Sequence, residues 1–154
     1  MHYFYKILLI ILLNISLFLS IAKADTLTEF EQQLAEYKGK VVYLDFWASW
    51  CIPCLRSFPW MNEIQQKYSN EDFAVFSVNL DADKSFATAF LEKTPANFPV
   101  FYDLKGKVAK AFKLRGMPSS YIIDRTGKIV SSHVGFNDEK KVAYQTEIEK
   151  LIHK

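Results

Sequence analysis

Cysteine is nearly absent from this chain of 154 residues, which contains only Cys51 and Cys54. Small exported proteins that depend on a disulfide framework carry several cysteine pairs, so that class is excluded. Glycine and proline are also few, at five residues each, and there is no repeat and no low-complexity linker. Half of the residues are hydrophobic, so the chain can bury a core without covalent staples, and a disordered chain is excluded.

A strong charge of either sign is missing as well. The formal net charge is +2, and two of the 19 basic residues, Lys6 and Lys23, precede Asp25. The basic and acidic residues that follow are therefore equal in number, and no basic run exceeds two residues. Surfaces that bind nucleic acid need clustered lysine and arginine, so we expect no nucleic-acid partner.

The longest hydrophobic run lies at the N-terminus and is short. Ile7–Ala22 is mostly apolar over 16 residues, whereas a helix needs about 20 to cross a bilayer. Ala22-Lys23-Ala24 matches a signal-peptidase cleavage pattern. We predict that residues 1–24 are a signal peptide, with an uncleaved N-terminal anchor as the alternative. Residues 25–154 would then form one domain in the periplasm or an equivalent extracytoplasmic space, where disulfides persist.

Two predicted strands flank the cysteines. Lys40–Trp47 and Phe73–Leu80 are nearly continuous apolar runs, the pattern of strands that are buried on both faces. Apolar residues recur at helical spacing over 51–69, which places a helix between the strands. The unit is therefore β-α-β, with two parallel strands and a right-handed crossover.

The other elements follow from periodicity and turn residues. Thr28 and Glu31 form a capping-box pattern that predicts a helix at 28–38. A helix at 84–93 is expected to bury Phe86, Ala89 and Phe90. The rest of the chain predicts an extended segment at 98–102, a helix at 107–113, a hairpin turning at 125–127 and a helix from Asn137 or Asp138 to about Ile152. This order predicts a three-layer α/β domain with a mixed sheet whose last strands are antiparallel.

Four interpretations of the cysteine pair compete. A purely structural disulfide would close a very short loop and gain only about 2 kcal/mol in the chain-entropy model. Half of a zinc site would need two more ligands, and after residue 24 the only histidines are His133 and His153, in no zinc-binding spacing. A peroxiredoxin pattern would need proline and threonine where Leu44 and Ala48 stand. The pattern favours the fourth interpretation, a redox-active dithiol.

The physical chemistry of a helix start supports this interpretation. Cys51 follows a buried strand and begins a helix, where free N–H groups and the helix dipole stabilise a thiolate. Cys54 lies one turn later and can attack a mixed disulfide formed at Cys51. Pro53 stands within the first turn, where its missing N–H costs nothing.

The segment LDFWASWCIPC (Leu44–Cys54) closely resembles the active-site segment of the thioredoxin superfamily. Three further positions carry the resemblance. Asp45 stands where the family keeps a buried carboxylate, Pro59 where the active-site helix is kinked, and GMPSSYIID (Gly116–Asp124) where a cis-proline loop enters an antiparallel strand. The resemblance covers about residues 28–154, and it implies a thioredoxin-like fold with a mixed central sheet and an antiparallel C-terminal hairpin.

The resemblance also implies roles for individual residues. Asp45 would be a buried proton relay for Cys54, with a pKa raised by burial, and the bond before Pro118 would be cis. A cis bend there would free the backbone of Met117 to pair with an extended substrate. The apolar surface that receives the substrate would comprise Trp50, Ile52, Pro53 and Met117. No cofactor or metal is expected beyond the redox-active disulfide, and His133 is expected to be structural.

Within the superfamily the chain looks most like exported reductases of the TlpA/ResA type, because of its N-terminal segment, the insertion at 84–102 and the IIDRTGKIV hairpin. It departs from that group at Ile52, where a glutamate is common, and in its helix at 28–38, which replaces an N-terminal hairpin. Thioredoxin pairs its buried carboxylate with a lysine, which is replaced here near Ser77. The group implies a monomer that takes protein thiol or disulfide substrates, such as apocytochrome c during cytochrome c maturation, and electrons from a transmembrane thiol donor.

Other functions remain open on the same fold. Thioredoxin has a reduction potential near about −270 mV and the oxidase DsbA near about −120 mV. Ile52 and Pro53 offer no donor or charge to stabilise the thiolate further, so we expect a reductase rather than a thiol oxidase or isomerase. A non-catalytic peptide-binding module is a third alternative, against which the intact pair of cysteines argues.

Overall fold

The structure is a computed structural model, and it describes residues 25–154. The predicted signal peptide, residues 1–24, lies outside the described residues. None of the helices formed by residues 25–154 combines the length and the apolar character needed to cross a lipid bilayer.

Five strands form one mixed sheet in the order β3-β2-β1-β4-β5. The strands are β1 (Val41–Trp47), β2 (Phe73–Asn79), β3 (Val100–Tyr102), β4 (Ser119–Ile123) and β5 (Ile129–Val134). β1 pairs with β2, and β2 with β3, in parallel, whereas β4 is antiparallel to both β1 and β5. β1 is therefore the central strand, and the predicted sheet with its antiparallel C-terminal hairpin is confirmed.

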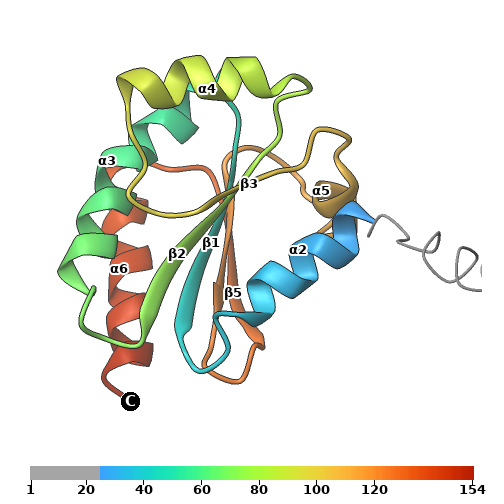
Figure 1. Ribbon diagram of the computed structural model, residues 1–154. Helices are drawn as coiled ribbons and strands as arrows, with labels where there is room; N and C mark the ends of the chain where they lie inside the picture. Colours follow the sequence, from blue (N-terminus) through green and yellow to red (C-terminus); the bar gives the residue numbers. More distant parts are fainter. Residues whose placement is uncertain (1–24) are drawn as a thin grey trace, which may run out of the picture.

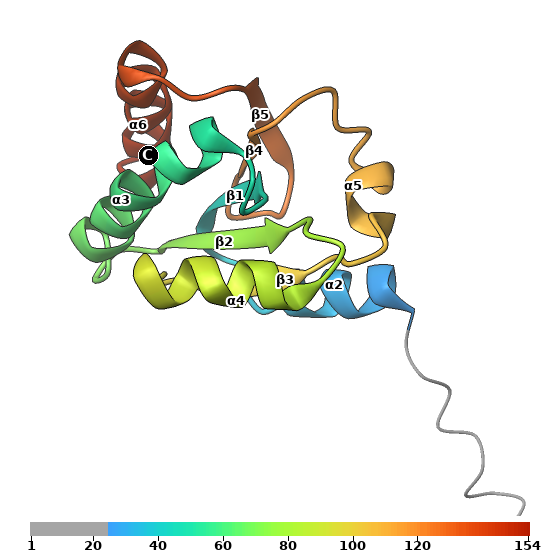
Figure 2. The same cartoon turned by 90° about the horizontal axis from the view of Figure 1, so that it is seen from above.

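Helices cover both faces of this sheet and complete three layers (Figure 1). The helices are α2 (Thr26–Ala35), α3 (Ile52–Lys67), α4 (Lys84–Lys93), α5 (Lys107–Ala111) and α6 (Asp138–Ile152). In both views α3 and α6 lie on one side of the sheet and α2 and α5 on the other (Figures 1 and 2). Alternate residues of β1 point to opposite faces, and all seven are buried, so the strand contributes to both cores.

Two helices differ from the sequence prediction. α2 starts at Thr26, because the Asp25 carbonyl already accepts a hydrogen bond from the Glu29 amide at 2.9 Å; the predicted cap at Thr28 is therefore wrong. The N-cap of α4 is Asp83, whose side chain accepts from the Ser85 amide at 2.8 Å. This start sets a phase in which Ala87 points inward, whereas Phe86 and Ala89 are exposed.

The buried face of α4 is one residue away from the predicted face. Ala87 is fully buried, and Phe90 packs on Trp47 and Phe58 with ring centroids 5.3 and 4.9 Å apart. Phe86 is 60% exposed. The periodicity identified the helix but assigned Phe86 to the wrong side.

Candidate active site

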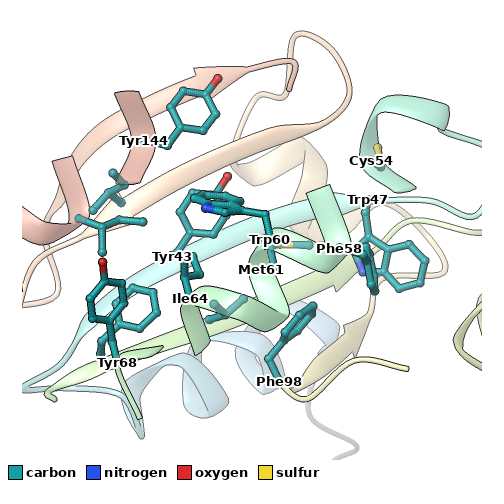
Figure 3. Packing of buried hydrophobic residues seen from close by; sticks show 14 of the residues in the cluster. Tyr43, Trp47, Cys54, Phe58, Trp60, Met61, Ile64, Tyr68, Phe98 and Tyr144 are labelled. Carbon is teal, nitrogen blue, oxygen red and sulfur yellow. The ribbon is translucent and has the colours of Figure 1, made fainter. Parts of the chain in front are cut away.

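The two cysteines lie at the start of α3 and form a disulfide. Cys51 is the N-cap residue, and Pro53 lies in the first turn, as predicted. Cys51 is 5% exposed and Cys54 is 0% exposed. Figure 3 shows Cys54 at the start of the helix, with Trp47 and Phe58 beneath it. Of the two residues, only Cys51 reaches the surface, and Cys54 is fully covered.

The surface around Cys51 is apolar and exposed. Trp50 is 68% exposed and Ile52 is 63% exposed, and Pro53 is exposed beside them. Large apolar side chains seldom gather on a surface without a binding role. The predicted substrate-facing residues on this loop are thus available to a partner.

The loop that carries Pro118 faces the same core as the cysteines. The Met117–Pro118 bond is cis, as expected. Met117 is half-buried and packs against the hydrophobic cluster that contains Cys51 and Cys54. Within residues 25–154, the backbone of Met117 makes no hydrogen bond with another backbone group. The loop is anchored on its far side instead, where the Gly135 amide donates to the Pro118 carbonyl at 2.8 Å.

Asp45 is a buried carboxylate on the α3 side of the sheet. Its side chain shares a face of β1 with those of Tyr43 and Trp47, since residues two apart in a strand point the same way. It is 1% exposed, and its Oδ2 has no hydrogen-bond partner within residues 25–154. Burial raises the pKa of the Asp45 carboxyl well above its usual range, as the sequence predicted. A carboxyl with a raised pKa lies closer in acidity to a thiol, so it is suited to exchange a proton with one.

The residue opposite Asp45 on β2 is Ser77. Ser77 lies where the sequence predicted that the lysine partner of thioredoxin's buried carboxylate is replaced. The Ser77 hydroxyl accepts a hydrogen bond from Trp47 Nε1 at 3.3 Å and donates to the Pro99 carbonyl at 3.1 Å. No cation on this side offsets the desolvation of the Asp45 carboxylate. The physical cause of the high pKa is therefore burial alone.

A second buried carboxylate, which the sequence reasoning missed, fixes the loop before Cys51. Asp81 is 1% exposed and accepts hydrogen bonds from the Ser49 amide at 3.0 Å, the Ser49 hydroxyl at 2.9 Å and Asn79 Nδ2 at 2.7 Å. The Leu80 amide also donates to the Trp47 carbonyl at 2.9 Å. The available signal was the polar sequence Asn79-Leu80-Asp81 at the end of a buried parallel strand, which adjoins the end of β1.

His133 lies in the last strand and is held by α6. Its Nε2 is 3.1 Å from Glu147 Oε2, and its ring stacks on Tyr144 with centroids 4.0 Å apart. Residues 25–154 contain no group of three or more side chains arranged to hold a metal ion. The structural role expected for His133 fits these contacts.

A family model described as Redoxin matches residues 21–149. Thiol-disulfide oxidoreductase ResA of Geobacillus thermodenitrificans is 34% identical over 99 residues, which make up 64% of this chain and 57% of the relative. ResA of Bacillus anthracis is 32% identical over 103 residues, or 67% of this chain and 60% of the relative. The chain thus spans less than two thirds of the length of these relatives.

Solved structures show the same arrangement of elements. A Chlorobium tepidum protein named thiol:disulfide interchange protein DsbE is 48% identical, with a TM-score of 0.76, and the match covers 77% of this chain and 84% of that one. An exposed lipoprotein thioredoxin of Streptococcus pneumoniae is 33% identical, with a TM-score of 0.66 and coverage of 77% and 90%. The thioredoxin-like fold and the similarity to ResA-type proteins, both predicted from the sequence, are confirmed.

Proposed function

Because the chain belongs to the redoxin family and carries a disulfide at the start of α3, we propose that it is a thiol:disulfide oxidoreductase that reduces disulfides of exported proteins. The observation that carries the proposal is the unequal exposure of the two cysteines on the side of the sheet that holds a buried acid. Cys51 is the accessible residue, Cys54 is covered, and Asp45 lies on the same side of the sheet.

The mechanism follows from this geometry. In the reduced protein, the Cys51 thiolate attacks one sulfur of a substrate disulfide, so a mixed disulfide forms and the other substrate sulfur leaves as a thiolate. Cys54 then transfers its proton to the Asp45 carboxylate and attacks the Cys51 sulfur. The second substrate sulfur leaves as a thiolate, and both substrate thiolates take up a proton from water. The substrate has gained two electrons and two protons, and the protein is left with the Cys51–Cys54 disulfide.

The direction of electron flow depends on how strongly the Cys51 thiolate is stabilised. The helix terminus is one source of stabilisation. The residues between the cysteines, Ile52 and Pro53, add neither a charge nor a side-chain donor. A strong oxidant needs additional stabilisation of its thiolate, so a reducing potential near that of thioredoxin, about −270 mV, is the expectation.

Location and partners are part of the same proposal. The pneumococcal relative is named an exposed lipoprotein, and the Ala22-Lys23-Ala24 pattern marks a signal peptide. The protein acts as a monomer outside the cytoplasmic membrane, where a transmembrane thiol donor re-reduces Cys51 and Cys54. Its substrates are extended protein segments, including the cysteine pairs of apocytochrome c.

The test combines two measurements on the mature protein. The first is the reduction potential of the Cys51–Cys54 couple, determined by equilibration with glutathione. A value near about −270 mV supports a reductase, and one near about −120 mV assigns an oxidase instead. The second is the reduction of insulin. If the reduced protein fails to reduce insulin, the proposal is wrong, and the chain is assigned as a non-catalytic peptide-binding module instead.

Substrate preference tests the apolar surface. We expect faster reduction of an apolar peptide disulfide than of oxidised glutathione, because the exposed Trp50 and Ile52 have no apolar partner in glutathione. Ile52→Ser should reduce this preference several-fold. Val142→Ser, at a residue of α6 that is 65% exposed, is the matched control and should leave it unchanged. A wild-type preference for glutathione contradicts the assignment of the surface.

A further inference from the structure

The proposed mechanism leaves one proton without a route. Each catalytic cycle adds a proton to Asp45 and removes it again, yet the carboxyl is 1% exposed and its Oδ2 has no partner. A group that is sealed from water exchanges protons slowly unless polar groups connect it to the surface. The neighbours of Asp45 in the sheet show where such a connection is available.

The β2 side of Asp45 is closed to proton transfer. Its neighbour there is Ser77, whose hydroxyl proton is donated to the Pro99 carbonyl at 3.1 Å. The same oxygen accepts from Trp47 Nε1 at 3.3 Å. A hydroxyl relays a proton only if it can donate and accept in turn. Ser77 has both partners fixed, and beyond it on β3 stands the apolar Val100.

The β4 side of Asp45 is polar as far as the edge of the sheet. Ser120 is directly opposite Asp45 on β4, and His133 is directly opposite Ser120 on β5. Residues that face each other in antiparallel strands point to the same side, with Cβ atoms about 4.5–5.5 Å apart. Asp45, Ser120 and His133, here called the polar row, therefore line up across three strands beneath α6.

The polar row reaches solvent at its outer end. Ser120 is 3% exposed, whereas the His133 side chain is 14% exposed and Glu147, 3.1 Å from it, is 40% exposed. Tyr144 of α6 stacks on the His133 ring and fixes its orientation. The exposure of the side chains in the polar row thus increases from the centre of the sheet to its edge.

Within residues 25–154, the groups that pack on the polar row are two tyrosines, a glutamate and the cysteine pair. Tyr43 is the neighbour of Asp45 on β1, and burial raises its pKa well above the usual range, with Asp45 adding to the rise and Ser120 opposing it. Tyr144 packs from α6, and its hydroxyl donates to the Gly135 carbonyl at 2.9 Å. Glu147 of α6 faces His133, and the cluster that contains the cysteine pair packs on the same side of the sheet as Asp45. Beyond Asp45 and Ser120, the row ends in the His133 ring, whose nitrogens can both accept and donate a proton.

We propose that Ser120 and His133 connect Asp45 to solvent at the β5 edge, so that the proton taken from Cys54 leaves along the polar row. In each cycle the Asp45 carboxyl gives its proton to the Ser120 hydroxyl, directly or through water, while Ser120 passes its own proton toward the His133 ring. His133 releases a proton to solvent beside Glu147. Charge and protons balance, because one proton enters the row and one leaves. Ser120 and His133 act through Asp45 and are positioning residues.

The test has a kinetic part, which rests on the proposed function, and a titration, which does not. Ser120→Ala and His133→Gln are compared with Ser132→Ala, which removes a hydroxyl from the next residue of β5, on the opposite face of the sheet. Single-turnover reduction of a peptide disulfide separates attack by Cys51 from resolution by Cys54. Both row variants should slow resolution by about tenfold, which is less than the contribution of a direct acid–base group because Asp45 is still present. Added imidazole should restore the rate in His133→Gln, and attack should be unchanged.

A second readout needs no substrate. The NMR signal of the Asp45 carboxyl carbon is titrated with pH in the oxidised protein, and its line width near the midpoint reports the rate of proton exchange. Both row variants should broaden the signal, and Ser132→Ala should not. Unchanged exchange and unchanged resolution in both variants overturn the inference. If wild-type protein reduces no disulfide, the proposed function fails, while the titration still decides whether the polar row carries the proton.

Discussion

The two faces of β1 carry different kinds of side chain. Val42, Leu44 and Phe46 point toward α2 and α5 and belong to a hydrophobic cluster. Tyr43, Asp45 and Trp47 point toward α3. One strand thus separates a mainly hydrophobic core from a core that holds a disulfide and an unpartnered carboxyl.

This difference shows how the fold divides its tasks. In the apolar core Phe30 packs on Phe76, Phe101 and Phe112 with ring centroids 5.4 to 5.9 Å apart, and such contacts add to the stability gained from burial. In the other core the buried Asp45 opposes stability, because a polar atom without a partner costs about 1–3 kcal/mol. The apolar face stabilises the sheet, and the α3 face provides the chemistry.

The largest effect is expected from the cysteines themselves. Cys51→Ser and Cys54→Ser should each abolish turnover, but only Cys54→Ser should accumulate a mixed disulfide with its substrate. The reason is that Cys51 is the accessible sulfur and Cys54 the covered one. Non-reducing gels and mass spectrometry of the trapped species check this. Equal trapping by Cys51→Ser contradicts the order of attack.

Asp45→Asn should slow resolution by about a hundredfold, at the lower end of what general acid–base groups contribute, and should change attack by Cys51 much less. Single-turnover kinetics at neutral pH provides the measurement. Leu44→Met is the control across the strand, since a volume-conserving change in the apolar core costs less than about 1.5 kcal/mol. A similar loss in both kinetic steps would mean that Asp45 acts on the thiolate of Cys51 instead.

Phe46→Ala, in contrast to Asp45→Asn, should lower the stability of the protein and leave its redox chemistry unchanged. Phe46 is fully buried in the apolar core, so its truncation should cost about 3–5 kcal/mol in the free energy of unfolding. The reduction potential should stay as in the wild type, because Phe46 and the cysteines belong to different clusters on opposite faces of the sheet. Phe86→Ala, at a site 60% exposed, is the control and should change stability by less than about 0.5 kcal/mol. A shifted potential in Phe46→Ala would show that the two faces are coupled.

The smallest effect concerns the pH dependence of stability. The pKa of Asp45 in the folded protein lies above its unfolded value, so the native state holds the proton more tightly. Wild-type stability therefore falls as the pH rises from the unfolded pKa through the folded one. Asp45→Asn lacks this loss, and its stability relative to the wild type should rise with pH, by about 1–3 kcal/mol. Urea unfolding at about pH 4 and about pH 8 measures the free energy of unfolding of both proteins. If the difference between Asp45→Asn and the wild type is the same at both pH values, burial does not raise the pKa of Asp45.

The sequence predicted the features that depend on local patterns. The apolar runs predicted β1 and β2, and the position of Cys51 between a strand and a helix predicted its place at the helix start. The burial of Asp45, which the family resemblance implied, is confirmed. The family resemblance, rather than any local pattern, gave the cis bond before Pro118.

Features that depend on register or helix phase could not be predicted in the same way. The buried side of α4 depends on the position of its N-cap, Asp83. The periodicity of the sequence did not fix which of two neighbouring faces points inward. The contact of Asp81 with Ser49 spans 32 positions and exists only because β1 and β2 end side by side. The alignment of Asp45 with Ser120 and His133 likewise requires the register of two antiparallel pairs, which no local signal contains.

The end of α6 lies far from Cys51, and one side chain holds it there. Arg125, in the turn between β4 and β5, donates from Nη1 to the Leu151 carbonyl at 2.7 Å and from Nη2 to the Ile152 carbonyl at 2.9 Å. The Arg125 carbonyl in turn accepts from the Gly39 amide, just before β1 begins, whereas Cys51 follows the opposite end of that strand, about 20 Å away. Figure 1 shows the C-terminus and the start of α3 at opposite ends of the molecule. A protein immobilised on a bead or an electrode through Lys154 would therefore present its disulfide to the solution, with the point of attachment rigidly fixed behind it.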